Sequence, residues 1–172
     1  WYSLTNDESV PRFVATACRI AVVTPRGFVL ASRGDIRCGV DSRVISSERA
    51  NCVQLVPLVM NPGFDQPSIH HILSVPAARA TAVRSLAALC RDNHLDGIQF
   101  DIENVHVSDR DAFTSFVRES VDSLHHAGCS VSAAVVPRTG TTPGPASSPH
   151  GIDANGRSVA QHQAPAHRPG FL

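Results

Sequence analysis

A short stretch of the chain, residues 98–103, carries two carboxylates in a pattern typical of a β-strand. Its apolar residues are Ile98, Phe100 and Ile102, and its polar residues are Gln99, Asp101 and Glu103. Side chains on a strand point alternately to two faces, so the sequence predicts one apolar face and one acidic face. The two carboxylates would lie roughly 7 Å apart, where they repel each other unless a substrate or hydrogen bonds lie between them. The acidic face is therefore a candidate site.

A solvated edge strand can also carry two acids with this spacing. The flanking sequence favours another interpretation, because helical patterns lie on both sides and Asp96-Gly97 leads into the strand. Together these features indicate a βαβ array with helices on the outer face. In a barrel of such units, acidic side chains at the C-terminal end of a strand are typical of a catalytic site.

The stretch 96–103 resembles the D-G-x-D-x-D-x-E signature of family 18 glycoside hydrolases, the chitinases and their relatives. The segments 56–61, 103–105, 108–113, 124–128 and 131–137 are also similar to the bacterial branch that includes spore-cortex and peptidoglycan N-acetylglucosaminidases. The resemblance covers roughly the first 145 residues. It implies hydrolysis of an N-acetylated polysaccharide or oligosaccharide, either chitin oligosaccharides or peptidoglycan, with retention at the anomeric carbon.

The resemblance also implies roles for individual residues. Glu103 would be the general acid that protonates the glycosidic oxygen and then the base that activates water. Asp101 would orient the 2-acetamido group of the substrate, which attacks the anomeric carbon in the substrate-assisted route. Asp96 would support the start of the strand.

Three further residues are candidates for substrate binding or support. Gln99 stands where the family pattern has an Asp, so this position keeps hydrogen-bonding capacity but cannot ionise. Asn61 follows an apolar strand and lies where barrel loops build sites, although turn formation is an alternative role for it. Asn104 directly follows the signature.

Alternating strands and helices are predicted around this site. Helices are expected over 9–18, from Asp41 to Asn51, over 67–94 with a break at Val75-Pro76, and from Ser108 to Gly128; strands are expected over 19–24, 53–60, 98–103 and 131–136, with a hairpin around 32–34. Pro57 should cause a local irregularity in its strand. Asp109 and Asp111 are expected to cap the helix that they open.

This order predicts an α/β fold, namely a partial (β/α)8 barrel with about strands 1 to 5 over residues 1–138. The family resemblance implies that Trp1-Tyr2 ends the first strand. The composition of residues 139–172 predicts a low-complexity tail that is disordered or frameshifted. A complete barrel of this kind needs about 250 residues. A doubly wound open sheet is the alternative, but the sequence has no G-x-G-x-x-G loop to support it.

Composition limits the function classes. The chain is 42% hydrophobic and 17% charged with zero formal net charge, which offers no electrostatic case for nucleic acid or an anionic membrane. The nine histidines show no metal-ligand spacing, so neither a metal nor a cofactor is predicted. The five cysteines are interpreted as small buried residues rather than a disulfide framework.

The sequence leaves a second function class open. In the family, later strands supply a Met-x-Tyr segment and a Trp beneath the sugar, whereas this sequence has its one Tyr and one Trp at positions 2 and 1. A catalytically inactive carbohydrate-binding or vestigial half-barrel is therefore the alternative to the enzyme. No signal peptide pattern precedes Trp1, the family resemblance implies a secreted or cell-envelope location, and nothing indicates the oligomeric state.

Overall fold

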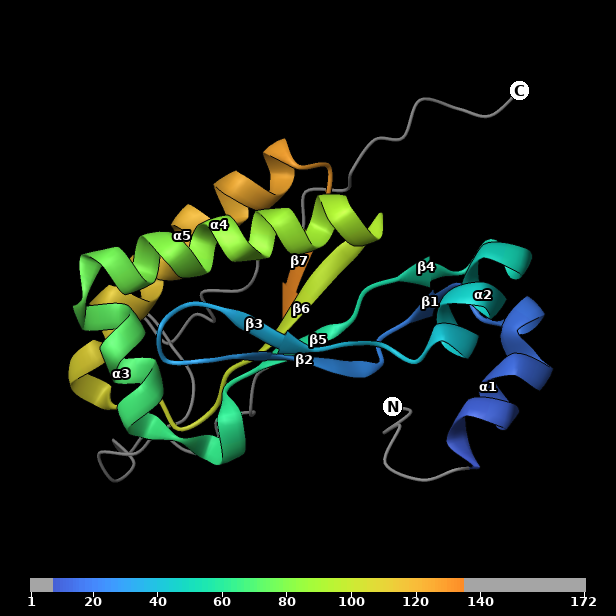
Figure 1. Ribbon diagram of the computed structural model, residues 1–172, viewed down its shortest axis with the longest axis horizontal. Coiled ribbons are helices and arrows are strands. Elements are labelled where there is room, and N and C mark those ends of the chain that lie inside the picture. Colours follow the sequence, from blue (N-terminus) through green and yellow to red (C-terminus); the bar gives the residue numbers. More distant parts are fainter. Residues whose placement is uncertain (1–7, 135–172) are drawn as a thin grey trace, which may run out of the picture.

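The computed structural model describes residues 8–134, which form a mixed helix and strand fold (Figure 1). Its helices are α1 (Ser9–Thr16), α2 (Ser42–Asn51), α3 (Gln66–Ser74), α4 (Pro76–Asn93) and α5 (Arg110–His126), with 3-10 turns η1 (Ala17–Arg19), η2 (Pro62–Phe64) and η3 (Val107–Asp109). Its strands are β1 (Val22–Val23), β2 (Arg26–Leu30), β3 (Ile36–Cys38), β4 (Gln54–Leu55), β5 (Leu58–Met60), β6 (Gly97–Asp101) and β7 (Ser130–Ala133). The predicted α/β class is confirmed.

The main sheet has the strand order β3-β2-β5-β6-β7. Strands β2, β5, β6 and β7 are parallel, whereas β3 folds back antiparallel to β2 and forms the predicted hairpin. A parallel pair, β1 and β4, continues the sheet towards α1 and α2 (Figure 1). The described residues form an open sheet and not a closed barrel.

Two prolines divide neighbouring strands at matching positions. The expected strand over 19–24 continues past Pro25 into β2, and the strand over 53–60 is interrupted at Pro57, so the predicted irregularity there is confirmed. Proline has no N–H to donate, but each of these prolines still accepts a ladder bond. The Pro25 carbonyl accepts from Leu58 N–H at 2.9 Å, and the Pro57 carbonyl accepts from Gln99 N–H at 3.0 Å.

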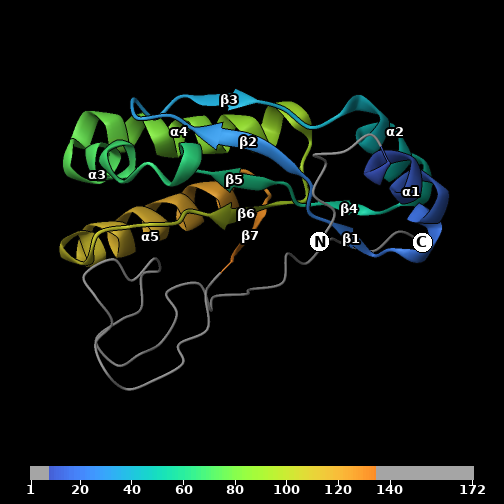
Figure 2. The ribbon, with the colours of Figure 1, turned by 90° about the horizontal axis from the view of Figure 1, so that it is seen from below.

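Most of the core lies between one face of the sheet and helices α3, α4 and α5, which Figure 2 shows against the strands, and the core extends to α1 and α2. The break predicted before Pro76 is confirmed, because α3 and α4 meet there at 100°. The inner stripe of α4 includes Leu86 and Cys90, and that of α5 includes Phe116 and Leu124, all almost completely buried. Phe116 contacts Phe100 of β6 with ring centroids 6.0 Å apart. These helices therefore fix the orientation of β6.

The start of α5 differs from the prediction. Asp109 makes no side-chain cap to the helix; its carboxylate is buried and lies 2.8 Å from Nδ1 of His70 on α3. The preceding turn is capped instead by His106, whose ring nitrogen accepts from Ser108 N–H at 3.2 Å. The capping prediction for Asp109 was wrong because His70, a hydrogen-bonding partner far away in the sequence, competes for the same carboxylate.

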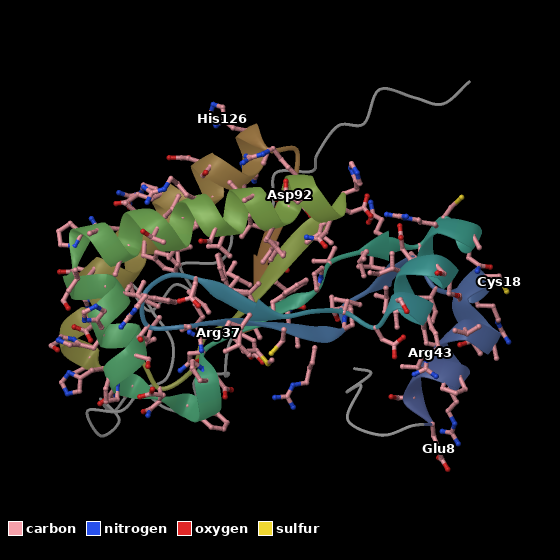
Figure 3. The ribbon with its side chains drawn as sticks, viewed as in Figure 1. Glu8, Cys18, Arg37, Arg43, Asp92 and His126 are labelled. Atoms are coloured by element: carbon pink, nitrogen blue, oxygen red, sulfur yellow. A yellow bond between two sulfur atoms is a disulfide. The ribbon has the colours of Figure 1, made fainter. Side chains whose placement is uncertain are left out.

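The cysteine prediction also needs correction. Cys90 at the end of α4 and Cys129 before β7 form a disulfide with their Cα atoms 6.3 Å apart. Cys18, Cys38 and Cys52 are free and exposed, and Figure 3 labels Cys18 at the end of the molecule formed by α1 and α2. The pairing was missed because the two sulfurs meet through the packing of α4 against α5, whose end leads to Cys129, and sequence spacing does not reveal this packing.

The predicted domain boundary at 138/139 and the tail over 139–172 lie outside the described residues. So do Trp1 and Tyr2, which were predicted to end a first strand. Within residues 8–134, no single helix has the length and apolar character needed to cross a bilayer; α3 and α4 reach them only when counted together across their bend.

Substitution of Gly97 by Ala is expected to destabilise the fold by about 1–3 kcal/mol. An added Cβ at this position would lie 2.8 Å from the carbonyl oxygen of Ser130, so β6 and β7 would have to separate. Gly39→Ala is the matched control, because its Cβ would have nothing within 4 Å. Urea unfolding of both variants measures the difference, and equal stabilities would contradict the close approach of β6 and β7.

Loss of the disulfide is expected to lower the free energy of unfolding by about 4 kcal/mol in the Cys90→Ala, Cys129→Ala double variant. The closed loop separates the two cysteines by 39 positions, and its constraint on the unfolded chain gives this magnitude. Alkylation without reductant should modify three thiols, and alkylation after reduction should modify five. Five modified thiols in the unreduced protein would refute the pairing.

Candidate active site at the end of β6

The alternation predicted for residues 98–103 is confirmed by burial. Ile98, Phe100 and Ile102 are 0%, 1% and 3% exposed on the helical face of the sheet. Gln99, Asp101 and Glu103 are partly exposed. Regular strand structure ends at Asp101, so Glu103 lies just past the end of β6. The apolar face holds the segment against α4 and α5, and the polar residues consequently point to the opposite side.

The parallel register brings the polar residues to one edge of the sheet. Asp101 is the Cα partner of Met60 on β5, and Gln99 is the partner of Leu58 on β5 and of Ser132 on β7. Because parallel strands end at the same edge, the turn after β5 and the segment after β6 leave the sheet side by side. The candidate residues therefore lie at the C-terminal edge of the sheet.

Asp96 lies at the other end of β6. One carboxylate oxygen accepts from Leu55 N–H at 2.9 Å, and the Asp96 carbonyl accepts from the backbone N–H and hydroxyl of Ser130 at 2.9 and 3.0 Å. These bonds join the start of β6 to the end of β4 and to the start of β7. Asp96 is thus separated from Asp101 and Glu103, and its geometry is that of a structural residue at the beginning of the strand.

Asn61 directly follows β5 and is 7% exposed. Its side-chain Nδ2 donates to the Glu103 carbonyl at 2.9 Å, and its Oδ1 accepts from Glu103 N–H at 2.9 Å. The side chain of Asn61 therefore contacts the backbone of Glu103 on both sides of its Cα atom.

Asn104 ties the next residue to the same turn. It adopts a left-handed backbone conformation with φ of 58°, which Asn tolerates better than most residues. Its Nδ2 donates to the Phe64 carbonyl at 2.9 Å, and its own carbonyl accepts from Nε2 of Gln66 at 3.1 Å. Phe64 also has a positive φ and is 63% exposed, so an aromatic ring stands at the edge of the site.

Electrostatics single out Glu103 among the candidate residues. Burial raises the pKa of its carboxyl group, the negative charge of Asp101 raises it further, and the positive charge of Arg26 lowers it in part. A carboxyl group with a raised pKa keeps a larger protonated fraction as the pH approaches neutrality. This is the property that a general acid requires.

Two residues of this region were not predicted from the sequence. Arg26 begins β2, acts on the charge of Glu103, and its Nε lies 3.4 Å from the Met60 sulfur. Gln66 begins α3 and contacts Asn104. Arg26 could have been placed near the site only from the parallel register of the strands, which aligns Arg26 with Leu58 and Gln99. No local pattern marks Gln66, because a polar residue in a first helical turn is ordinary.

Other features of the described region lie apart from these residues. Among residues 8–134, no group of three or more His, Cys, Asp or Glu side chains is placed to hold a metal ion. A hollow of about 530 Å³ lies between the β2–β3 hairpin, α2 and α4, and Asp92, labelled in Figure 3, is one of its lining residues. None of the predicted site residues lines this hollow.

The fold of the described residues is the fold found in chitinases and spore cortex-lytic enzymes. The structure of the Bacillus megaterium spore cortex-lytic enzyme SleL aligns with a TM-score of 0.74 and 17% identity, over 81% of this chain and 33% of SleL. A chitinase from Chromobacterium violaceum aligns with a TM-score of 0.70 and 20% identity, over 76% of this chain and 43% of the chitinase. At these identities the likeness establishes the fold alone.

The chain is also similar in sequence to Bacillus subtilis proteins. Over 77 residues the chain is 34% identical to a protein of Bacillus subtilis strain 168 that bears the name "Putative sporulation-specific glycosylase YdhD". The match includes 45% of this chain but only 18% of YdhD, so the chain spans less than a fifth of that relative. No protein-family profile matches the chain. The chain is therefore similar in sequence to a glycosylase and in fold to chitinases and cortex-lytic enzymes.

Replacement of Glu103 by Gln is expected to increase stability near neutral pH. The pKa of Glu103 is raised in the folded protein, so the native state binds more protons than the unfolded state above the ordinary Glu value of 4.5. Stability of the parent protein should then fall as pH rises from about 4.5 through the folded pKa, and the Gln variant should lack this fall.

Urea unfolding between pH 3.5 and 8 measures the effect. The two proteins should differ least at the acidic end, where Glu103 is neutral in both states. Glu8→Gln, which removes an exposed carboxyl group before α1, is the control. The quantity compared is the free energy of unfolding of the Gln variant minus that of the parent. If this difference is smaller at pH 7 than at pH 4, the raised pKa of Glu103 is contradicted.

Proposed function

We propose that the protein is a glycoside hydrolase that cleaves N-acetylglucosamine-containing polysaccharide, chitin or peptidoglycan, with retention and by substrate-assisted catalysis. The observation that carries this proposal is a partly buried Glu103 whose pKa is raised by burial and by Asp101. It lies at the C-terminal edge of a parallel sheet, where barrel enzymes keep their catalytic groups. Similarity to a named glycosylase and the shared fold with chitinases support the same reaction class.

We also propose the architecture that this function requires. Residues 1–138 would form the first part of a (β/α)8 barrel. Its strands 2 to 5 would be β1 with β2, β4 with β5, β6, and β7. The solved structures with this fold are more than twice as long as the aligned part, which is consistent with further barrel strands in such proteins. The polar row of β6 would face the barrel interior and the sugar.

In the proposed mechanism, protonated Glu103 gives its proton to the glycosidic oxygen as the bond to the leaving sugar breaks. The carbonyl oxygen of the substrate's own 2-acetamido group attacks the anomeric carbon and forms an oxazolinium ion. Asp101 orients the acetamido group and stabilises the positive charge that develops on it. The Glu103 carboxylate then takes a proton from water as the water oxygen attacks the anomeric carbon. The bond between that carbon and the acetamido oxygen breaks, so the acetamido group is regenerated and the configuration is retained.

The Gln99 side chain favours an alternative to the enzyme, namely a protein that binds carbohydrate without hydrolysing it. Gln99 lies beside Asp101 in the polar row and cannot exchange a proton with it. In this alternative the row hydrogen-bonds the sugar but the acetamido group is not activated. Binding without hydrolysis would be the result.

The test is hydrolysis of a chromogenic N-acetylchitobioside by the full chain. Glu103→Gln should lower kcat by about 10²–10⁴-fold, because it removes the transferable proton and keeps the shape. Asp101→Asn should also lower kcat. Neither the parent protein nor the two variants should cleave a substrate that lacks the acetamido group. Equal rates for the parent and Glu103→Gln would remove the enzyme assignment, and saturable binding in the same samples would favour the binding protein.

A further inference from the structure

Regular pairing between β5 and β6 stops before Glu103. The last pair in register is Met60 with Asp101, so β5 supplies no backbone partner to Glu103. The side chain of Asn61 supplies both missing bonds, from Nδ2 to the Glu103 carbonyl and from Glu103 N–H to Oδ1, each at 2.9 Å. A primary amide carries one acceptor and two donors in a plane, so it can reproduce the pairing of a neighbouring strand.

This arrangement fixes the direction of the Glu103 side chain. With both N–H and C=O held, the φ and ψ of Glu103 cannot rotate without the loss of a hydrogen bond, and its Cα–Cβ bond keeps one orientation. Asn61 itself is 7% exposed and directly follows a buried strand, so the surrounding residues hold its side chain in place. The bonds of Asn104 to Phe64 and of Gln66 to Asn104 extend the same connection by one residue.

The contacts also argue against Asn61 as a residue that binds sugar. Its oxygen and one of its amide hydrogens are engaged with Glu103, and the small exposed fraction leaves little surface for a ligand. Its neighbour Asp65, by contrast, caps α3 by accepting from Ser68 N–H at 3.3 Å. The turn between β5 and α3 is therefore built from side chains that hold backbone.

We propose that Asn61 is a positioning residue that holds the backbone of Glu103 and thereby aims its carboxyl group. This inference deepens the proposed function and rests on it for its kinetic consequences, but the geometry it asserts can be measured without turnover. A freed Glu103 would reach solvent more often, and its pKa would then move back towards the ordinary Glu value because burial is the main cause of the shift.

The direct test compares the parent protein with Asn61→Ala by NMR on the full chain. The Glu103 amide should exchange at least about tenfold faster with solvent in the variant, since its acceptor is gone. The Glu103 carboxyl carbon should titrate at lower pH than in the parent. Asn51→Ala is the matched control, because it also removes an Asn side chain that donates to a backbone carbonyl, Ser47 at 2.8 Å, but on α2.

A second variant keeps the test decisive if Asn61→Ala does not fold. Asn61→Asp keeps an oxygen that can accept from Glu103 N–H but has no donor for the Glu103 carbonyl. Its Glu103 amide should stay protected, and its added charge should move the Glu103 titration to higher pH. Exchange and titration of Glu103 that match the parent in every folded Asn61 variant would overturn the proposal.

Kinetics then separate the positioning role from the proposed function. Asn61→Ala should lower kcat by about 100-fold with little change in KM, as expected for a misplaced catalytic group. The fall of kcat with rising pH should move to lower pH. A raised KM with unchanged kcat would mean a substrate contact and would overturn the positioning role. A parent protein without turnover would defeat the proposed function alone, because the NMR result still decides whether Asn61 holds Glu103.

Discussion

The burial of one face of β6 is the constraint on which the rest of the described structure depends. Ile98 and Phe100 are almost completely enclosed by the long helices. A shift of this strand by one residue would place Gln99 and Asp101 in the apolar core, at a cost of several kcal/mol per unpaired polar group. The register is therefore strongly determined, and the direction of the acidic residues follows from the packing of apolar residues on the opposite face.

The candidate site works against the stability that this packing provides. Two carboxylates near each other at a strand end repel, and partial burial penalises the charged form of Glu103. Arg26 offsets this only in part. The surrounding structure holds the arrangement through hydrogen bonds to backbone, made by Asn61, Asn104 and Gln66. Strain of this kind, supported by neighbouring residues, is typical of functional sites.

Much of the fold could be predicted from local sequence. Period-two alternation indicated the faces of β6, Asp41 capped α2 as its position predicts, and Pro76 marked the bend between α3 and α4. The errors came from contacts between distant segments. Asp109 joins His70, Cys90 joins Cys129, and Asn61 joins Glu103 across 39 to 42 positions. Helix and strand periods carry no information about such pairs, so the support of Glu103 could only be seen once β5 and β6 were placed in register.

The bridge between Cys90 and Cys129 has a topological consequence. The residues between these cysteines include all of β6, the acidic residues that follow it and the whole of α5. The candidate catalytic residues Asp101 and Glu103 therefore belong to a covalently closed ring rather than to an open stretch of chain. A single peptide-bond cut anywhere in that ring, for example at the exposed turn around Val107, would leave both new ends attached to the same molecule.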